Sequence, residues 1–498
     1  MKLGDIVSQF EVIKSVEYLG SGSVDIMSVD ILGLNHNSRE VCRGDLFFAL
    51  SGNKVDGHKY VSDAIERGAV AVVVERLVEN CSVPQVLVED TRAAMSVFAA
   101  KFYGDAYKQL RLVAVTGTNG KTTVSHIISN ILEANGDSVA IVGTLGVIVR
   151  GKKLDVDYGL TTPDPIQLHK LFARLVQLGI QFVVMEVSAH ALYLNKVQGL
   201  RFECSVFTNF SRDHLDFFNT MQNYKKAKLK LFDNTYTGTA IVNIDDDFGL
   251  ELSRNSDLNM ITYGCDRPSD VFGINLKMSS DGLQYMLNCV DNLVDINFAI
   301  PGRFSMYNTM AAASCAYVLK VPIKKIAIGI QNTTKVEGRF DIIKSDKYTV
   351  VIDYAHTDDG LSNVLNTIKQ FAKKRIITVF GCGGNRDATK RPLMGLIAAK
   401  YSDYVIVTSD NPRYENPDSI INQIVMGIKS QNGTNYECCT QRDQAIIRSL
   451  EIAEKDDIIL IAGKGAENTQ EINGKFLPHN DWTFVQKSIH NSQFTIHN

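Results

Sequence analysis

The sequence lacks the features that mark secreted and membrane-spanning proteins. Its nine cysteines are scattered between Cys42 and Cys439 without a C-x-x-C pair, so they fit reduced structural thiols better than a disulfide framework. The N-terminal segment has no long apolar core of the kind found in signal peptides. No run approaches the roughly 18 apolar residues that a membrane-spanning helix requires. We therefore expect a cytoplasmic protein that does not bind membranes.

Long stretches of one charge are also absent. The chain has 52 Lys and Arg residues against 55 Asp and Glu residues, which gives a net charge of −3, and no long basic run occurs. A nucleic-acid-binding protein depends on a broad positive surface. We therefore expect no nucleic-acid partner, although a local basic site for an anionic small molecule stays open.

Internal repeats and low-complexity stretches are missing as well, so domain boundaries must come from changes in pattern. At 498 residues the chain is long enough for about three domains. From Arg111, apolar strands, glycine-containing loops and helices alternate, and this rhythm starts again near Gly338, which is typical of parallel sheets covered by helices. The sequence predicts an α/β fold with three domains: a mixed α/β domain (1–109), a central parallel-sheet domain (110–337) and a Rossmann-like domain (338–498).

The clearest motif is GTNGKTT at residues 117–123, which lies between an apolar strand and a helix. Glycines let backbone amides face phosphate oxygens, and a helix N-terminus adds partial positive charge. Lys121 would neutralise the β- and γ-phosphates, and the Thr122 hydroxyl would bind Mg²⁺. Val115 stands where the longer P-loop pattern has a glycine, so an ordinary glycine-rich turn is the alternative. The predicted nucleotide-binding residues are Gly117, Thr118, Asn119, Gly120, Lys121, Thr122 and Thr123.

Three further features of the central region carry possible ligands. Glu186 ends an apolar strand, where its carboxylate could bind a hard cation such as Mg²⁺. Asp213 and His214 fit a helix cap with a surface histidine as well as they fit a metal site. The pattern of the lysine-rich segment 224–230 alone predicts a solvated helix face.

Ten motifs occur in the order found in Mur ligases, and the chain resembles this family over essentially its whole length. They are GTNGKTT, LTTPDP, MEVSAH, VFTNFSRDHLDF, the Y-x-x-A-K-x-x-L-F helix, DYAHT, FGCGGNRD, KRPLM, DNPR and AGKGAE. The segments NSREVCRGDLFFAL and GHKYVSDAI are similar to the family's uridine-binding domain. The resemblance implies an ATP- and Mg²⁺-dependent ligase. We expect it to act as a monomer that binds no nucleic acid. It would join meso-diaminopimelate to UDP-MurNAc-L-Ala-D-Glu through an acyl phosphate, in peptidoglycan precursor synthesis.

The resemblance also assigns roles to single residues of the first two domains. It implies that Lys228 is carbamylated and that Lys121, His214 and Lys228 are catalytic. The implied Mg²⁺ ligands are Thr122, Glu186, His214 and Lys228. The implied contacts with UDP and the muramyl peptide are Ser38, Thr161, Thr162, Ser188 and Lys196, and those with the nucleotide are Asn308 and Arg339. Asp353 and His356 match the interdomain hinge and a strand at the ATP site.

The segment DNPR, at residues 410–413, resembles the family's signature for diaminopimelate. Arg413 could clamp the extra carboxylate of this substrate with two parallel hydrogen bonds, whereas it would repel the distal ammonium of lysine. On local sequence alone, Asp-Asn-Pro is a common turn. The implied amino-acid contacts are Arg386, Asp410, Asn411, Pro412, Arg413, Gly463 and Glu467, and Glu467 could accept a hydrogen bond from the substrate ammonium.

Five positions depart from the family pattern, and several alternatives stay open. The departures are Leu194, Lys196, Ser305, Asp358 and Ala466. The first two put the muramyl-peptide contacts in question. Alternatives within the class are enzymes that add lysine or D-Ala-D-Ala, and folylpolyglutamate synthase, which lacks a uridine-binding first domain. Outside it are a P-loop ATPase that drives a conformational change in a partner and a non-catalytic nucleotide-binding scaffold.

Overall fold

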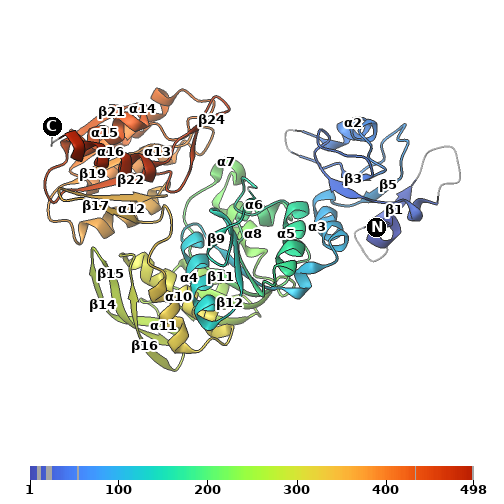
Figure 1. Cartoon of the computed structure of the whole chain (residues 1–498), viewed down its shortest axis with the longest axis horizontal. Helices are drawn as coiled ribbons and strands as arrows, with labels where there is room; N and C mark the ends of the chain where they lie inside the picture. Colours follow the sequence, from blue (N-terminus) through green and yellow to red (C-terminus); the bar gives the residue numbers. More distant parts are fainter. Residues whose placement is uncertain (8–12, 18–24, 53–54, 157, 432, 496–498) are drawn as a thin grey trace. The chain divides into compact units, whose positions relative to one another are not determined.

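The computed structural model describes residues 1–7, 13–17, 25–52, 55–156, 158–431 and 433–495. Figure 1 shows an α/β chain in which helices pack on three main sheets. Contacts between Cα atoms divide it into two compact units. The first holds Met1–Ala114, Ser138–Glu203 and Ala227–Gly238, and the second holds Val115–Asp137, Cys204–Lys226 and Thr239–Asn498.

The N-terminal part of the first unit is built on a five-stranded sheet of order β1-β5-β4-β3-β2. β2 to β5 run parallel to their neighbours, and β1 pairs with β5 in the antiparallel sense. The strands are β1 (Ile13–Glu17), β2 (Gly33–Asn35), β3 (Asp45–Phe48), β4 (Ala71–Val74) and β5 (Gln85–Val88). The helices are α1 (Leu3–Val7), α2 (Val61–Glu66) and α3 (Thr91–Phe102), with 3₁₀ turns at Ile26–Ser28, Gly57–Tyr60 and Ala106–Gln109.

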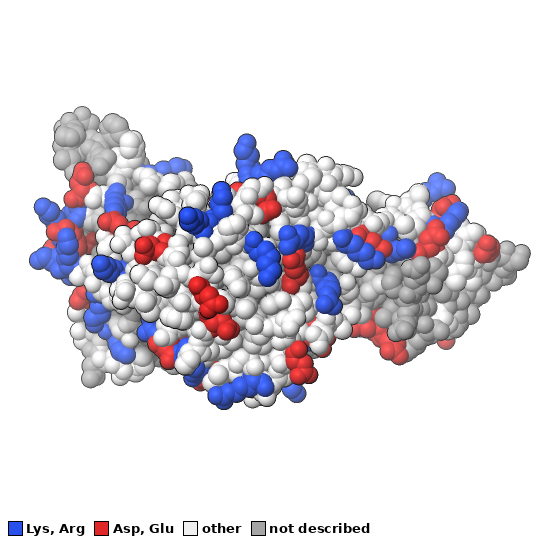
Figure 2. Space-filling model, turned by 90° about the horizontal axis from the view of Figure 1, so that it is seen from below, with Lys and Arg blue, Asp and Glu red and all other residues white. Residues whose placement is uncertain are grey.

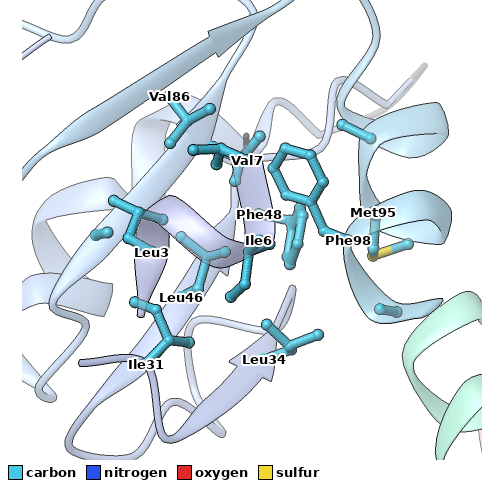
Figure 3. Packing of buried hydrophobic residues seen from close by; sticks show 14 of the residues in the cluster. Leu3, Ile6, Val7, Ile31, Leu34, Leu46, Phe48, Val86, Met95 and Phe98 are labelled. Carbon is cyan, nitrogen blue, oxygen red and sulfur yellow. The ribbon is translucent and has the colours of Figure 1, made fainter. Parts of the chain in front are cut away.

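Every residue of β3 is buried because both faces of this sheet are covered. Leu46 and Phe48 point to the face that α1 and α3 cover, where Phe48 meets Phe98 with 6.1 Å between ring centroids (Figure 3). Phe47 points to the opposite face and packs in a second cluster with Val61 of α2. This alternation along one strand is the two-residue period of a β-strand.

The rest of the first unit carries parallel strands that end in polar loops. β10 pairs in parallel with β7, and β7, β8 and β9 form antiparallel pairs. Its elements are β7 (Val139–Gly143), β8 (Gly146–Val149), β9 (Lys152–Lys153), α5 (Pro165–Gln177), β10 (Phe182–Glu186) and α6 (Ala189–Tyr193). β6 (Arg111–Thr116), β11 (Phe202–Phe207), α8 (Met221–Leu229) and β12 (Thr237–Asn243) each have residues in both units.

The middle region of the second unit continues this sheet, which has 11 strands in the described residues. β12, β13 and β14 are parallel, whereas β14, β15 and β16 form an antiparallel meander that the sequence analysis did not predict. The elements are α4 (Lys121–Asn135), α7 (Leu215–Phe218), α9 (Asp247–Arg254), β13 (Asn259–Tyr263), β14 (Val271–Ser279), β15 (Gly282–Cys289), β16 (Asn292–Phe298), α10 (Arg303–Val318) and α11 (Ile323–Asn332).

The C-terminal part of the second unit is a six-stranded sheet of order β17-β18-β22-β19-β20-β21, parallel except for β17. The four predicted strands are β18, β22, β19 and β20, so their carboxyl ends are neighbours. Its strands are β17 (Asp341–Lys344), β18 (Thr349–Asp353), β19 (Ile376–Phe380), β20 (Tyr404–Thr408), β21 (Tyr436–Cys439), β22 (Ile458–Ala462), and the separate hairpin β23 (Thr469–Ile472) and β24 (Lys475–Pro478). Its helices are α12 (Asp358–Lys369), α13 (Lys390–Tyr401), α14 (Pro417–Ser430), α15 (Arg442–Ile452) and α16 (Asp481–Thr495). The predicted three-domain α/β fold is confirmed, with a Rossmann-like sheet at its C-terminal end.

Two surface and helix properties bear on the predicted partners. Within the described ranges, no helix combines the length and the apolar character that crossing a bilayer requires. On the face shown in Figure 2, basic and acidic side chains are interspersed over the surface without a broad area of one sign. The mixture agrees with the small net charge of the sequence.

Candidate active site

The loop between β6 and α4 is packed so closely that two of its residues have to be glycine. Gly117 has a φ of 151°, and a Cβ atom there would lie 1.9 Å from Thr208 Oγ1. Gly120 has a φ of 87°, and a Cβ atom there would lie 2.6 Å from Asn308 Oδ1. The backbone is thus curled before a helix N-terminus, which is the arrangement that binds phosphate.

Asn209, which follows β11, fastens this loop from the side. Its carbonyl oxygen accepts from the backbone N–H of Thr118 at 2.9 Å, and its Oδ1 accepts from the N–H of Asn119 at 2.9 Å. Its Nδ2 donates to the Asn119 carbonyl at 3.1 Å, and Thr208 Oγ1 donates to the same oxygen at 2.6 Å. The structural role of Thr208 and Asn209 is therefore to hold the phosphate loop.

The predicted nucleotide residues of the second unit lie together. Lys121 Nζ donates to the carbonyls of Gly117 and Thr118 at 3.0 and 2.9 Å, within its own loop. Arg339 Nη2 donates to Thr122 Oγ1 at 3.0 Å, and its guanidinium stacks 4.3 Å from the ring centroid of Tyr354. Arg339, 217 positions along the chain from Thr122, therefore contacts the threonine of the phosphate loop.

Asp213 is a buried carboxylate surrounded by three groups that can carry positive charge. Its oxygens lie 3.3 Å from His214 Nε2, 3.6 Å from His356 Nε2 and 3.9 Å from Lys390 Nζ. Burial raises the pKa of Asp213, but the hydrogen bond from His356 and the nearby charges outweigh it and hold the pKa well below its usual value. His214 is left-handed, with a φ of 56°, at the first position before α7 and makes no side-chain capping bond. The cap interpretation of the Asp213–His214 pair is therefore not supported by a hydrogen bond to the helix.

In the first unit, the Glu186 carboxylate is held where β10 ends. Its two oxygens accept from the backbone N–H and the hydroxyl of Thr144, each at 3.0 Å. A Cβ atom on Gly143 would lie 2.1 Å from Glu186 Oε1, so glycine is required beside it. Thr162 Oγ1 donates to the Glu186 carbonyl at 2.9 Å and accepts from the Ser188 N–H at 3.2 Å. Glu186, Thr162 and Ser188 thus form one hydrogen-bonded network.

Lys196 takes part in a second cluster of this unit. Its Nζ lies 2.8 Å from Asp164 Oδ1 and donates to the Thr162 carbonyl at 3.4 Å. The neighbouring imidazole of His36 has its pKa lowered by burial, and Asp164 and Lys196 both act on its charge. Thr161 belongs to the Glu186 network instead, with its Oγ1 3.2 Å from Thr144 Oγ1.

Lys228 on α8 is 1% exposed. The interpretation of residues 224–230 as a solvated helix face is therefore wrong at this position, and also at Tyr224, which is 1% exposed. Lys226 and Lys230 are exposed, so the pattern was right for the outer side of the helix. A buried lysine is uncommon, because a charged side chain is costly to bury.

In the C-terminal sheet, the ends of β20 and β22 build a polar network around a buried lysine. Lys464, 0% exposed on its side chain, donates from Nζ to Asn411 Oδ1 at 3.0 Å and to Glu467 Oε2 at 2.7 Å. Asn411 Nδ2 donates to the same Glu467 oxygen at 2.8 Å. Sequence reasoning missed Lys464, although it lies between the predicted Gly463 and Glu467 in AGKGAE. Gly463 has to be small because a Cβ atom there would lie 2.6 Å from Asp410 Oδ2.

Arg413 is engaged on two sides of its guanidinium. Its Nε lies 3.0 Å from Glu471 Oε2, and its Nη1 donates to the Gly384 carbonyl at 2.8 Å. Pro412, just before it, is buried. Arg386, also predicted to contact the amino acid, is half exposed and lies 3.4 Å from Asp216 Oδ2 instead. The structure thus brings the DNPR and AGKGAE residues together in one polar network and leaves Arg386 in an ion pair with the loop that holds His214.

The residues fit a nucleotide and offer oxygen donors for a cation. In the second unit, the glycine cradle, Thr122 and Asn308 suit a phosphate chain, and the Thr122 hydroxyl is a hard oxygen donor of the kind that Mg²⁺ prefers. In the first unit, the Glu186 carboxylate offers oxygen donors of the same kind. Across the described stretches of chain, no group of three or more His, Cys, Asp or Glu side chains is arranged to hold a metal ion.

Three protein-family models match the chain in succession. The catalytic domain of the Mur ligase family matches residues 30–103, the Mur ligase middle domain matches 115–316, and the Mur ligase glutamate ligase domain matches 338–465. The chain belongs to the Mur ligase family. It is a ligase, and ATP binding is typical of that family.

Individual relatives cover nearly the whole chain. It is 41% identical over 470 residues to UDP-N-acetylmuramoyl-L-alanyl-D-glutamate--2,6-diaminopimelate ligase 1 of Clostridium acetobutylicum, which covers 93% of this chain and 95% of that protein. A solved structure of UDP-N-acetylmuramoyl-L-alanyl-D-glutamate--2,6-diaminopimelate ligase has a TM-score of 0.69 and 30% identity, over 99% of each chain. The MurF ligase of Thermotoga maritima in complex with ADP has a TM-score of 0.60 over 86% of this chain and 93% of that one. At 19% identity, this last likeness shows the fold alone.

Proposed function

We propose that this chain joins meso-diaminopimelate to the γ-carboxylate of the D-glutamyl residue in UDP-MurNAc-L-Ala-D-Glu, using ATP, in the cytoplasm as a monomer. The observation that carries the proposal is the position of Arg413, a partly exposed guanidinium beside the polar network where β20 and β22 end. A distal carboxylate is what separates diaminopimelate from lysine, and a planar guanidinium is the side chain best suited to bind one.

The reaction proceeds in two balanced steps. The D-glutamyl γ-carboxylate oxygen attacks the γ-phosphorus of ATP, the bond to the β-phosphate oxygen breaks, and an acyl phosphate and ADP result. The amine of diaminopimelate then attacks the acyl carbon, phosphate leaves, and the amine loses a proton as the amide forms. The chain acts mainly by holding the reactants and by neutralising charge.

The nucleotide would lie on the phosphate loop. Lys121 would exchange its bonds to the loop carbonyls for phosphate oxygens, and Asn308 and Arg339 would flank the nucleotide. Mg²⁺, when bound, would neutralise phosphate charge, and its proposed ligands are the Thr122 hydroxyl, Glu186, His214 and a carbamate on Lys228. The burial of Lys228 supports the last of these, because it keeps the end of this side chain out of bulk solvent.

The muramyl-peptide end would lie in the first unit. Thr161, Thr162, Ser188 and Lys196 surround the end of β10, and Ser38 marks the UDP segment. Lys196, which departs from the family's arginine, keeps a positive charge but pairs with Asp164. We therefore propose that it offers one charge to the substrate without the two-pronged geometry of an arginine.

Phosphate release from ATP tests the proposal. The protein is incubated with UDP-MurNAc-L-Ala-D-Glu and meso-diaminopimelate, L-lysine or no amino acid. We expect turnover with diaminopimelate alone. Turnover with lysine would place the chain among lysine-adding enzymes, and turnover that needs neither would favour a P-loop ATPase. Transfer of ¹⁸O from a labelled D-glutamyl carboxylate to phosphate tests the acyl phosphate step.

A further inference from the structure

A carboxylate that neither the motifs nor the family assignment pointed to lies beside Arg413. Glu471, on β23, places Oε2 3.0 Å from Arg413 Nε. The two side chains are 22% and 21% exposed, so the pair is neither sealed in the core nor loose on the surface. Both charged groups are therefore partly open to a ligand.

Backbone contacts fix this pair in place. The Arg413 N–H donates to the Glu471 carbonyl at 3.1 Å, and the Asn473 N–H donates to the Arg413 carbonyl at 2.7 Å. The Glu471 N–H donates to Asn411 Oδ1 at 2.9 Å. Arg413 has a φ of 51°, a left-handed conformation that is uncommon for residues other than glycine and that clusters at functional sites. The hairpin β23–β24 thus holds Glu471 beside Arg413 independently of their charges.

The guanidinium itself is fixed in one plane. Its Nε faces Glu471 and its Nη1 binds the Gly384 carbonyl. A Cβ atom on Gly383 would lie 2.9 Å from Nη1, so the loop after β19 packs directly on the guanidinium. A fixed guanidinium with a carboxylate beside it presents opposite charges at defined positions.

Glu467, which the resemblance assigned to the substrate ammonium, already has partners of its own. Glu467 Oε2 accepts from the buried ammonium of Lys464 and from Asn411 Nδ2, at 2.7 and 2.8 Å. A substrate ammonium at Glu467 would have to share this oxygen's environment with a lysine. Glu471 has no such buried lysine on its carboxylate; its ion-pair partner is Arg413, which also has a substrate group to bind.

We propose that Arg413 and Glu471 together recognise the distal end of meso-diaminopimelate, with Arg413 binding its carboxylate and Glu471 its ammonium. The inference rests on the proposed function and names a further specificity-determining residue for it. The distal carbon of diaminopimelate carries both groups, whereas lysine ends in an ammonium alone. A cation–anion pair binds both charged groups of this zwitterion, whereas an arginine by itself binds only the carboxylate.

Substrate analogues separate recognition of the ammonium from support of Arg413. The measurement is kcat/KM for meso-diaminopimelate and for 2-aminopimelate, which keeps the distal carboxylate but has no distal ammonium. We expect Glu471→Gln to lower the value for diaminopimelate roughly 10- to 100-fold, the range for a charged hydrogen bond, and to leave 2-aminopimelate within about twofold of the wild type. Glu471→Asp should show a smaller loss with the same selectivity.

Two other outcomes of this measurement would overturn the proposal. An equal loss for both substrates would mean that Glu471 only positions Arg413, and no loss for either would mean that it is not used; each overturns the proposal. Glu437→Gln is the matched control, because Glu437 also pairs with an arginine, Arg448, at 3.1 Å in the same sheet region, and it should behave as wild type. Failure of the wild type to turn over diaminopimelate at all would instead overturn the proposed function.

Discussion

The phosphate loop and the amino-acid pocket are built in opposite ways. The loop consists of seven consecutive residues held by Thr208 and Asn209, and its geometry allows no added Cβ at Gly117 or Gly120 without a close contact. The pocket takes its shape from side chains supplied by the ends of β19, β20 and β22 and by the hairpin β23–β24, with Arg413 and Glu471 58 positions apart in the chain. A binding site made of backbone is rigid and shared among many enzymes, whereas one made of distant charges can be retuned for a new substrate.

Gly117→Ala should have the largest effect on turnover. The new Cβ would lie 1.9 Å from Thr208 Oγ1 at a φ of 151°, so the loop has to move. Misplacing catalytic groups by about 1 Å costs roughly 10²-fold or more in rate. We expect kcat/KM for ATP to fall by at least that factor in the phosphate-release assay, while diaminopimelate binding to the pocket is retained.

Gly136→Ala is the matched control for that change. Gly136 also has a positive φ, 99°, but no atom lies within 4 Å of its would-be Cβ. It should lose about 1–2 kcal/mol of stability from backbone strain and keep normal turnover. Equal losses of turnover in both variants would show that strain, not the clash with Thr208, explains the effect.

Arg413→Ala should affect the other region. Its partly exposed pair with Glu471 suggests a loss of about 2 kcal/mol, a factor of roughly 30, at the low end of the range for a charge pair in a binding site. We expect the KM for diaminopimelate to rise by that factor and the KM for ATP to stay the same. An unchanged KM for diaminopimelate would contradict the assignment of DNPR.

The same contrast decides what could be predicted from the sequence. The GTNGKTT loop and strands β18, β19, β20 and β22 were predicted because their signals are contiguous. Burial of Lys228 was not, since a lysine-rich helix has the same pattern whether one lysine faces inward or outward. Nothing in the spacing shows that Lys464 reaches Asn411, 53 positions away, or that β23 runs beside Arg413. The antiparallel strands β14 to β16 were missed as well.

Lys464→Met should show how far the pocket depends on its buried support. The change removes the donor to Asn411 and Glu467 and leaves their oxygens in a buried site. We expect a stability loss of about 1–3 kcal/mol, seen in thermal unfolding, and a roughly tenfold higher KM for diaminopimelate with an unchanged KM for ATP. Lys475→Met on β24, an exposed lysine of the neighbouring hairpin, is the control and should be neutral. An altered KM for ATP would mean that the two regions are not independent.

His169 belongs to neither region, so replacing it should change the pH dependence of the unfolding free energy without changing turnover at pH 7. This residue of α5 is 1% exposed, and its ring centroid lies 5.7 Å from those of Tyr107 and Phe172. Burial lowers its pKa from 6.5 to about 4. Below pH 6.5 the unfolded chain therefore binds a proton that the folded chain does not, so stability falls between pH 6.5 and about 4, by about 3 kcal/mol in total.

His169→Phe keeps the ring contacts and removes the titration. Its unfolding free energy should fall less than that of the wild type over this range, while His126, whose pKa burial also lowers to about 4, contributes equally to both. Parallel curves for the two proteins would show that His169 is protonated as easily in the folded chain as in the unfolded one.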